Sequence, residues 1–457
     1  MTHEIESLER RGWEALAGPS GAGFYDESGE VAIVVDRATA ERPGEAEPYR
    51  ARDVLGVRAA GRPLAIAPAP AVPGSRLRRR KTRLRRVRNL ALFGLAALAV
   101  IVGGAWMFRE QLAPFLGVNV DTGPGGRATL TVPPGYAASV FADGLANPRF
   151  ADVSPDGVLF VAERGADRVV ALPDENRDGR ADAVAEVGAG YGSAHDLAFT
   201  DADTLLVAGE QTLWEVTLDE LREVDRRPLV EGLPAGGFHT SKSVAVLRSG
   251  DVLLSIGSSC NVCREADERR ATVQLLADGE LRPWMTGLRN AVGLWVDPDT
   301  GRAWATNMGR DLLGDHEPPE TLYELVDGTD AGWPRCHAGS LRDPEFGLDA
   351  DACDGIAEPA ATFPAHTAPL DLVVWEDHLV VALHGSWNSS VKVGYALWWI
   401  PWNGQPAGEP EPFATGFLPD GASDALGRPA GLAVGADGAL YVSDDKAGFI
   451  YRIERDN

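Results

Sequence analysis

The C-terminal two thirds of the chain carries a histidine and an arginine that could support proton transfer beside an anionic ligand. His239 lies in GLPAGGFHTSKSVAV (232–246), and Arg289 precedes Asn290 in TGLRNAVGLWV (286–296). An imidazole can take a hydroxyl proton near neutral pH because its pKa lies close by. A guanidinium can clamp a carboxylate through two parallel hydrogen bonds. Residue type alone equally allows His239, one of eight histidines, to be an ordinary surface-loop side chain.

An acidic run, DENRDGRAD (174–182), has the spacing of a calcium-binding loop, with Gly179 at the sharp turn. Its candidate oxygen ligands are Asp174, Asn176, Asp178 and Asp182. The bidentate glutamate expected at the twelfth loop position is Ala185. The run therefore predicts either a second calcium site or a simple solvated acidic turn.

All four cysteines lie in this same C-terminal part, at positions 260, 263, 336 and 353. An even number in an oxidising compartment indicates disulfides, and four cysteines allow three pairings. The simplest expectation is two local pairs, Cys260–Cys263 and Cys336–Cys353. The alternative is a metal or redox site at the CxxC motif, but no second CxxC and no neighbouring histidine pattern supports zinc.

Charge is distributed unevenly along the chain, which has 43 basic and 67 acidic residues and a net charge of −24. This balance argues against nucleic acid as a partner. Residues 76–89 hold nine bases and no acid, and residues 90–108 that follow contain no charge. Nineteen helical residues are long enough for a bilayer core of about 30 Å. We expect a single transmembrane helix in the cell membrane, with a cytoplasmic N-terminus and an extracytoplasmic C-terminal part. The alternatives are a buried core helix and a cleaved signal peptide.

The segment before this span, residues 1–72, contains an amphipathic opening and the strand-like runs VAIVV and PLAIA. Its pieces resemble parts of small α+β domains of the SnoaL/NTF2-like type, without the middle of such a domain, so we interpret it as a possible remnant. The predicted organisation is a cytoplasmic segment 1–72, a linker and basic stretch 73–89, a transmembrane helix 90–108, an extracytoplasmic linker 109–129 and a large domain 130–457.

Six segments of the large domain repeat one pattern, an Asp- or Gly-containing turn followed by a run of apolar residues. They are PDGVLFVAERG (155–165), DADTLLVAGEQ (201–211), RSGDVLLSIGS (248–258), PDTGRAWATNMG (298–309), WEDHLVVALHGSW (375–387) and GADGALYVSDDKAG (435–448). The first four start roughly 46 to 50 residues apart, and such a period is typical of propeller blades. Six repeats predict an all-β fold, a six-bladed β-propeller.

Eight ordered motifs extend this picture, among them SIGSSCNVC (255–263), TNMGRDLLGDHEPPETLYEL (306–325), GWPRCHAG (332–339), HGSWN (384–388) and GRPAGLAVGADGALYVSDD (427–445). With the two loops quoted first, they resemble the soluble quinoprotein glucose/sorbosone dehydrogenase family, especially its sorbosone branch, over about residues 130–455. That family is a six-bladed propeller that binds pyrroloquinoline quinone (PQQ) and calcium. The resemblance therefore implies the same fold that the repeats predict independently.

The resemblance also implies roles for individual residues. His239 falls at the family's catalytic base, and Arg289 and Asn290 at its quinone-contacting pair. Positions matching its other cofactor-binding cations are Lys242, Lys392 and Arg428. The family's calcium takes backbone carbonyls at positions matching Gly309 and Arg310, and the nearby Asp311 and Asp315 could add carboxylate oxygen or hydrogen bonds.

Two positions depart from the glucose-oxidising branch. An aspartate beside the catalytic histidine is Ser258 here, and a second carboxylate-binding arginine is Ala430. A serine orients an imidazole less well than a carboxylate does. These departures leave glucose in doubt as the substrate.

The function that the resemblance implies is a membrane-anchored, PQQ- and calcium-dependent sugar dehydrogenase. It would oxidise an aldose or sugar aldehyde and pass electrons to an external or membrane acceptor. One alternative is a propeller without catalysis that binds a ligand or a partner. Another is a calcium-dependent lactonase-like hydrolase, whose ring of metal-binding carboxylates and asparagines is not evident in the sequence.

Overall fold

The structure is a computed structural model that describes residues 125–456 and, of the residues before them, six short strands between Glu14 and Pro63. The chain divides into two units, residues 1–103 and 104–457. The expected span at 90–108, the basic stretch and any helix of the N-terminal segment lie outside the described residues. Within the described part of the chain, no helix is long and apolar enough to cross a membrane.

The first unit contains one four-stranded sheet and one small hairpin. The sheet has the order β1 (Glu14–Gly18), β2 (Gly21–Tyr25), β3 (Val31–Val35) and β4 (Val54–Gly56). The hairpin pairs β5 (Arg58–Ala59) with β6 (Arg62–Pro63). The run VAIVV, expected to be extended, forms β3.

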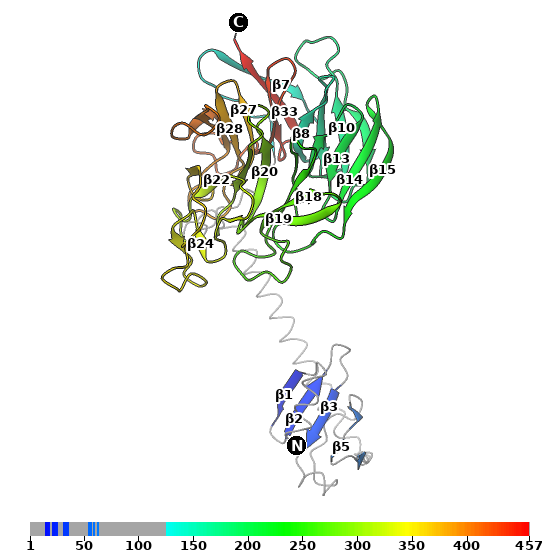
Figure 1. Cartoon of the computed structure of the whole chain (residues 1–457), viewed down its shortest axis with the longest axis vertical. Helices are drawn as coiled ribbons and strands as arrows, with labels where there is room; N and C mark the ends of the chain where they lie inside the picture. The colour runs from blue at the N-terminus through cyan, green and yellow to red at the C-terminus, as the bar shows by residue number, and fades with distance from the viewer. Residues whose placement is uncertain are drawn as a thin grey trace, which may run out of the picture. The chain divides into compact units, whose positions relative to one another are not determined.

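The second unit is a six-bladed β-propeller, as the repeats predict (Figure 1). Each blade has four antiparallel strands, of which the first lies innermost. Blade 1 consists of β8 (Pro148–Val153), β9 (Leu159–Glu163), β10 (Arg168–Leu172) and β11 (Ala185–Ala189). Blade 2 consists of β12 (Asp196–Phe199), β13 (Thr204–Ala208), β14 (Thr212–Asp219) and β15 (Arg222–Glu231). Blade 3 consists of β16 (Val244–Val246), β17 (Val252–Ile256), β18 (Thr272–Ala277) and β19 (Glu280–Thr286), with β23 (Thr329–Asp330) added in parallel.

The remaining blades continue around the ring. Blade 4 consists of β20 (Ala291–Val296), β21 (Ala303–Asn307), β22 (Glu320–Glu324) and β26 (Ala361–Phe363). A hairpin of β24 (Cys336–His337) and β25 (Leu341–Arg342) lies in the connection before β26. Blade 5 consists of β27 (Pro369–Trp375), β28 (His378–Leu383), β29 (Ala396–Pro401) and β30 (Glu411–Ala414). Blade 6 consists of β31 (Pro429–Val434), β32 (Leu440–Asp444), β33 (Phe449–Arg455) and β7 (Tyr136–Ala142).

The six repeats of the sequence are the second strands of the six blades, β9, β13, β17, β21, β28 and β32. These strands are apolar on both faces because each lies between two neighbouring blades, and most of their residues are buried. The turns before them need positive φ, which glycine supplies at Gly157 (φ 89°) and Gly438 (φ 79°).

Blade 6 closes the ring by combining the two ends of the domain. Strand β7, which precedes blade 1 in sequence, pairs antiparallel with β33, the last strand, from Tyr136 opposite Arg455 to Ala142 opposite Ile450 (Figure 1). The Ala128 N–H also donates to the Tyr451 hydroxyl at 2.8 Å. The innermost strands β8, β12, β16, β20, β27 and β31 thereby surround a central channel.

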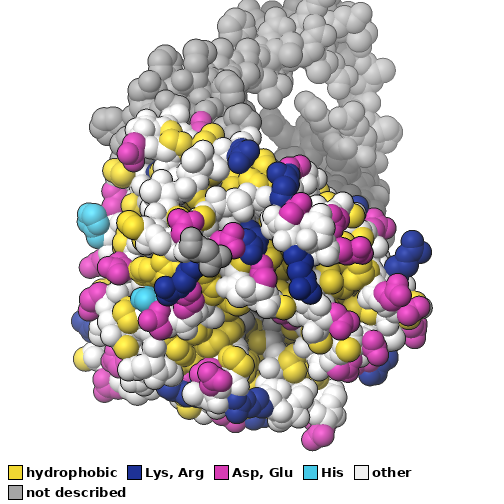
Figure 2. Space-filling model, turned by 90° about the horizontal axis from the view of Figure 1, so that it is seen from above, with side chains coloured by type: hydrophobic (Ala, Val, Ile, Leu, Met, Phe, Trp, Pro, Cys, Tyr) yellow, Lys and Arg dark blue, Asp and Glu magenta, His cyan; other side chains and the backbone are white. Residues whose placement is uncertain are grey.

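The antiparallel order sorts the connecting loops onto two faces. We call the face at which the innermost strands begin the entry face. Loops that follow each second strand, and loops that lead into the next blade, lie on this face. Loops after each first and third strand lie on the other, the exit face. Figure 2 shows acidic and basic side chains interspersed on one side of the molecule, with hydrophobic side chains exposed between them. Charge of a single sign therefore does not dominate the side that is shown.

Candidate active site

Three loops of the entry face on blades 3 and 4 bring together the predicted base, the quinone-contacting pair and the predicted calcium positions. His239 lies in the loop leading into β16, Arg289 and Asn290 lead into β20, and Gly309 to Asp311 follow β21. A Cβ added to Gly257 would come within 2.5 Å of the His239 Cβ and 2.7 Å of the Asn290 Oδ1. Glycine at this position therefore lets the imidazole and the amide lie close together.

Ser258 holds the imidazole of His239 in one tautomer. Nδ1 lies 3.0 Å from the Ser258 carbonyl oxygen and 2.9 Å from its Oγ. The carbonyl can only accept, so Nδ1 carries the proton and Nε2 keeps its lone pair. The Ser258 hydroxyl in turn donates to the Cys260 carbonyl at 2.7 Å. Within the described residues no hydrogen bond reaches Nε2, which is therefore available to accept a proton.

Electrostatics keeps His239 neutral. Burial and the nearby Arg289 lower the pKa of His239 to about 3. The ring is thus deprotonated at Nε2 at every physiological pH, as a general base requires. An anionic ligand placed beside Arg289 would offset that cation and raise the pKa of His239 toward its ordinary value.

Arg289 is almost fully buried, and each of the three nitrogens of its guanidinium donates at least one hydrogen bond. Nη1 donates to the Gly309 carbonyl at 2.6 Å, and Nη2 donates to Asp311 Oδ2 at 2.7 Å. Nε donates to the Asn261 carbonyl at 2.9 Å, and Nη2 also donates to Asn261 Oδ1 at 3.0 Å. The head group is therefore fixed in place before any ligand arrives.

Asn261, which the sequence interpretation did not single out, organises this part of the site. Its Oδ1 accepts the Asp311 N–H at 2.8 Å, and its Nδ2 donates to the Asp311 carbonyl at 3.0 Å. Its own carbonyl also accepts the Trp333 indole N–H at 3.2 Å. The only available signal was its place inside the CNVC motif.

Both predicted disulfides are present. Cys260 is bonded to Cys263, and Cys336 is bonded to Cys353. The first closes the short loop that presents Asn261. The CxxC metal alternative is wrong for this state, because both sulfurs are consumed in the disulfide.

The predicted calcium ligands offer hard oxygens, but a cation already binds two of them. The Gly309 carbonyl and the Asp311 carboxylate both accept hydrogen bonds from Arg289. The side chain of Arg310 points elsewhere, into ion pairs with Asp343 and Glu345. Oxygen donors of this kind fit the chemistry of Ca²⁺, and their use by the ion requires Arg289 to release them.

Arg428 and Lys392 form a separate group on blades 5 and 6. Both cations lie over the ring of Tyr395, at 5.4 and 5.6 Å from its centroid. Arg428 also donates from Nε to the His384 carbonyl at 3.0 Å. Lys242 belongs to neither group, because it is fully buried and donates to the Thr240 carbonyl at 2.7 Å.

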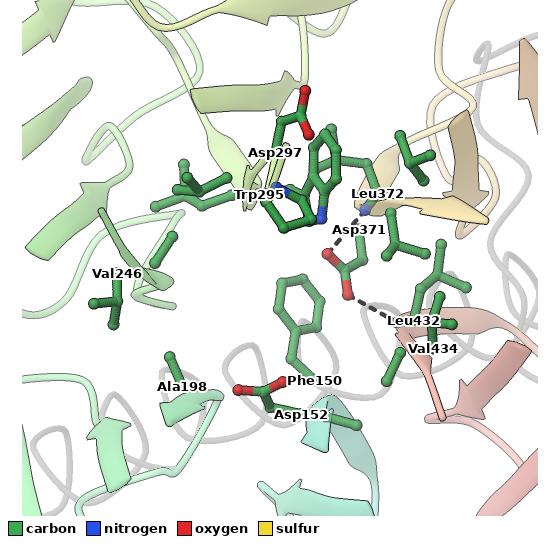
Figure 3. A pocket seen from close by; sticks show the side chains of 18 of the residues that line it. Phe150, Asp152, Ala198, Val246, Trp295, Asp297, Asp371, Leu372, Leu432 and Val434 are labelled. Carbon is green, nitrogen blue, oxygen red and sulfur yellow. Dashed lines mark hydrogen bonds between the residues drawn. The ribbon is translucent and has the colours of Figure 1, made fainter. Parts of the chain in front are cut away.

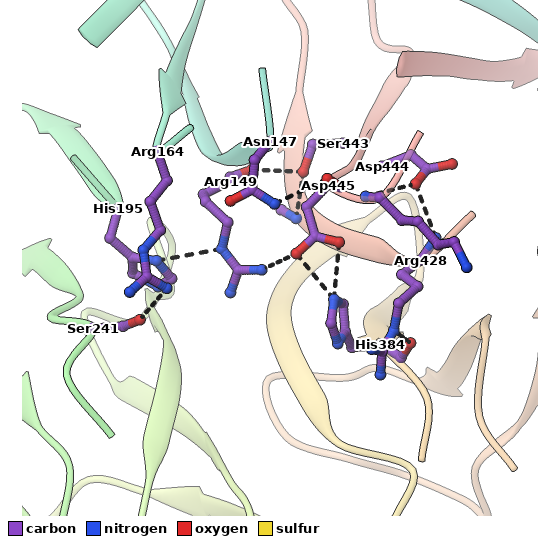
Figure 4. A network of polar contacts seen from close by, with 12 residues as sticks. Asn147, Arg149, Arg164, His195, Ser241, His384, Arg428, Ser443, Asp444 and Asp445 are labelled. Atoms are coloured by element: carbon purple, nitrogen blue, oxygen red, sulfur yellow. Dashed lines mark hydrogen bonds and ion pairs between the residues drawn. The ribbon is translucent and has the colours of Figure 1, made fainter. Parts of the chain in front are cut away.

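A polar network on blades 1, 2, 5 and 6 adds residues that the motifs did not reveal (Figure 4). Arg149 donates from Nε to His195 Nδ1 at 3.3 Å and forms an ion pair with Asp445. Asp445 also contacts His384 Nε2 at 2.9 Å. Each of these side chains leaves the chain next to the start of an innermost strand or the end of a second strand, so the fold alone assembles them.

Below the entry face the channel is plugged and then opens. Phe150, Val292, Leu370 and Ala430, from four innermost strands, pack with Met308. Beyond this plug lies a cavity of about 640 Å³. Figure 3 shows Phe150, Asp152 and Asp371 around it. Ala430 is wholly buried in the plug, so this position presents no side chain to the entry face.

Three aspartates of the channel join neighbouring blades. Asp152 accepts the Phe199 N–H at 2.9 Å, Asp196 accepts that of Val244 at 2.8 Å, and Asp371 accepts that of Leu432 at 2.8 Å. Burial raises the pKa of Asp152 to about 6 and that of Asp371 to about 7. Their oxygens are committed to backbone amides, which gives these residues a structural role.

The expected second calcium loop lies apart from all of this. The connection between β10 and β11 follows a third strand and is therefore on the exit face. Its side-chain oxygens accept amides of the same loop, such as Asp174 Oδ2 from Gly179 at 3.0 Å and Asp182 Oδ2 from Glu175 at 2.7 Å. Among the described residues, the only His, Cys, Asp or Glu group with ligand atoms within 4.8 Å of one another is Cys260, Cys263 and Glu265. Asn176 and Asp178 likewise take part in hydrogen bonds within this loop. The second calcium site at this loop stays a prediction.

Comparisons with known proteins agree with this fold. A family model described as TrAA12-like matches residues 130–317 and 339–456. The pyrroloquinoline quinone-dependent pyranose dehydrogenase of Coprinopsis cinerea is 26% identical over 414 residues, covering 74% of this chain and 56% of that protein. The chain thus spans little more than half the length of this curated relative.

Two solved structures share the architecture. The holo form of the pyranose dehydrogenase PQQ domain from Coprinopsis cinerea has a TM-score of 0.64 and 24% identity, covering 73% of this chain and 98% of that one. A calcium structure of a Trichoderma reesei enzyme of family AA12 has a TM-score of 0.63 and 21% identity, covering 74% and 99%. The relationship to PQQ-dependent sugar dehydrogenases that the motifs indicate is confirmed.

Proposed function

Because this chain belongs to the TrAA12-like family, we propose that it is a PQQ- and calcium-dependent dehydrogenase that oxidises a sugar. The observation that carries the proposal is the His239 imidazole, neutral, fixed through Nδ1 and open at Nε2, within reach of Arg289 and Asn290. The curated relative's name states PQQ dependence and a pyranose substrate.

The residues of the entry face fit the cofactor. PQQ is a tricarboxylate, and this face of an acidic protein gathers Arg289, Arg428, Lys392 and Arg149 around one end of the channel. When bound, PQQ supplies an ortho-quinone that accepts hydride from the sugar. We assign Arg428 and Lys392 to carboxylate binding, and Arg289 and Asn290 to the quinone end.

The chain's own part in the reaction is proton removal and charge stabilisation. His239 takes the proton of the reacting hydroxyl at Nε2, and the Ser258 carbonyl stabilises the imidazolium that forms through the Nδ1–H. Arg289 and Asn290 donate hydrogen bonds to negative charge that develops nearby. Exposed hydrophobic side chains next to the site loops, Phe238, Leu312 and Trp387, offer apolar surface to a sugar ring.

The direct test is to titrate the purified protein with PQQ in the presence of Ca²⁺ and to follow the cofactor's absorbance while aldoses and sugar aldehydes are added. We expect saturable binding and loss of the quinone absorbance with at least one sugar. PQQ binding without reduction by any sugar would leave the non-catalytic binding module in its place.

We further propose that residues 90–108 anchor the chain in the cell membrane, with the propeller outside the cytoplasm. The charge pattern motivates this topology. Two disulfides support an oxidising compartment for the propeller. Protease added to intact cells should remove the propeller and spare an N-terminal fragment, and a protected propeller would reverse the topology.

A further inference from the structure

Two cations of the entry face, Arg164 after β9 of blade 1 and Lys242 before β16 of blade 3, form no ion pair in the described residues. Arg164 donates only to hydroxyls, those of Ser193 at 3.0 Å, Thr240 at 3.3 Å and Ser241 at 3.4 Å. Lys242 Nζ donates only to the Thr240 carbonyl. Throughout residues 125–456, neither forms an ion pair within 4 Å. Burial lowers the pKa of both side chains, and the longer-range attraction of Glu210 only partly offsets this effect. An arriving anion therefore stabilises the site.

His195 adds an unsatisfied donor to the same place. Its Nδ1 accepts a hydrogen bond from Arg149, so the proton of the neutral ring resides on Nε2. That Nε2–H is buried and has no hydrogen-bond partner in the described part of the chain. Burial, with Arg149 and Arg164 nearby, holds the pKa of His195 well below its usual value, so the ring stays a neutral donor.

Arg149 of blade 1 lies beside the part of blade 6 where the resemblance implies a second arginine and the chain has Ala430. Its carbonyl accepts the Ser443 hydroxyl at 2.5 Å, and a Cβ on Gly431 would lie 2.5 Å from that same oxygen. Arg149 therefore borders the Ala430–Gly431 segment of β31. A carboxylate-binding cation expected from blade 6 is absent at Ala430, and blade 1 supplies Arg149 and Arg164 beside it.

We propose that Arg149, Arg164, Lys242 and the Nε2–H of His195 form a second carboxylate-binding site, distinct from the one assigned to Arg428 and Lys392. Arg164 contacts Thr240 and Ser241, the two residues that follow His239. A carboxylate held there lies beside the proposed base. This carboxylate can belong to the cofactor or to the substrate. If it belongs to the substrate, the substrate is a sugar acid. Both choices of ligand rest on the proposed function.

The first experiment detects the site without any redox reaction. Benzene-1,3,5-tricarboxylate (trimesate), a planar carboxylate that is not a quinone, is added to the full-length protein in calcium-free buffer, and the melting temperature is measured. We expect trimesate to stabilise the wild type and to stabilise Arg164→Gln and His195→Phe much less. Arg227→Gln, which removes an exposed cation of blade 2 paired with Glu215, is the matched control and should respond as the wild type does.

The second experiment distinguishes the two sources of the carboxylate. If it belongs to the cofactor, Arg164→Gln weakens PQQ binding about 10- to 100-fold, the usual effect of losing a charge-assisted hydrogen bond. The ratio of kcat/KM for glucuronate over glucose then stays unchanged. If it belongs to the sugar, PQQ binding is unchanged and that ratio falls by about the same factor. His195→Gln, which keeps an N–H donor, should restore part of what His195→Phe loses.

The outcomes separate this inference from the proposed function. If the wild-type protein binds trimesate through Arg164 but never binds PQQ, the carboxylate site is supported and the dehydrogenase assignment is wrong. The site is overturned if Arg164→Gln and His195→Phe both fold and match the wild type in trimesate response, PQQ affinity and sugar preference. Should Arg164→Gln fail to fold, His195→Phe against His195→Gln decides the question alone.

Discussion

His239 and Ser258 form a pair in which the serine's backbone is as important as its side chain. The imidazole Nδ1–H reaches both the Ser258 carbonyl, at 3.0 Å, and its hydroxyl, at 2.9 Å. A carbonyl acceptor fixes the tautomer without adding a negative charge. The aspartate of the glucose-oxidising branch would do the same and also raise the pKa of the base. The serine therefore preserves the direction of the proton transfer while leaving the base weak until an anionic ligand binds.

Replacing His239 by alanine should remove the base and leave cofactor binding nearly intact. We expect turnover to fall by about 10² to 10⁴, the usual contribution of a positioned general base. Steady-state kinetics beside a PQQ titration measures both effects. His378→Ala, at the exit-face start of β28, is the control and should change neither. Full turnover by His239→Ala would show that another group takes the proton.

Ser258→Ala tests whether the backbone carbonyl suffices. The variant keeps the carbonyl acceptor and loses both hydrogen bonds of the hydroxyl, those with His239 and with the Cys260 carbonyl. Only the first acts on the imidazole and is worth about 1 kcal/mol, so turnover should fall by less than about tenfold. The measurement is kcat at saturating PQQ. A loss as large as that of His239→Ala would assign the orientation of the ring to the hydroxyl instead.

Asn261→Ala should act through Arg289. The substitution removes the side-chain contacts to Arg289 and Asp311 and leaves the Asn261 carbonyl in place. We expect weaker PQQ binding, in the same direction as Arg289→Gln and smaller than its effect of about 10- to 100-fold. Turnover at saturating PQQ should change little. Asn176→Ala, in the exit-face acidic turn, is the matched control, and an equal loss there would point to general destabilisation.

The pH dependence of stability should carry the signature of His239. Its folded-state pKa, about 3, lies below the ordinary value near 6.5. As the pH falls from about 6.5, the unfolded chain binds a proton that the folded chain refuses, so stability declines. One such histidine contributes at most about 1.4 kcal/mol per pH unit.

Other buried groups overlap in this range, because Asp152 and Asp371 have raised pKa values and favour the folded state as pH falls. The comparison is therefore between wild type and His239→Gln, by denaturant unfolding at pH 7, 6 and 5. The variant should lose less stability on acidification. Identical curves would mean that His239 titrates normally in the folded protein.

The six-bladed fold could be predicted from the sequence because one strand in each blade has a recognisable local pattern. The second strands lie between neighbouring blades, are apolar throughout and follow tight turns, so they repeat visibly. The short strands β16 and β26 have no such pattern, because their place is set by neighbours already formed. The grouping of residues into six blades was therefore predictable, and their exact bounds were not.

The structure brings together His239, Arg289 and Asn290, where chemistry and motif coincide in the sequence. Asn261, Arg149 and His195 escaped because nothing in their local sequence marks them. Arg149 and His195 are 46 residues apart and meet only because each stands at the start of an innermost strand. The acidic run 174–182 stays a prediction, because a spacing typical of calcium loops also suits a turn whose carboxylates cap its own amides.

Because β7 pairs with β33, blade 6 can form only late in the synthesis of the domain. The first strand of the domain must wait for the last, and the Ala128–Tyr451 hydrogen bond spans 323 residues of chain. Blade 6 therefore cannot form until β33 has been translated, and the apolar edges of blades 1 and 5 stay uncovered until then. Contacts so distant in sequence form slowly. If the domain is exported, it must cross as an unfinished ring, and a truncation of only the final strand would leave five blades without a closing partner.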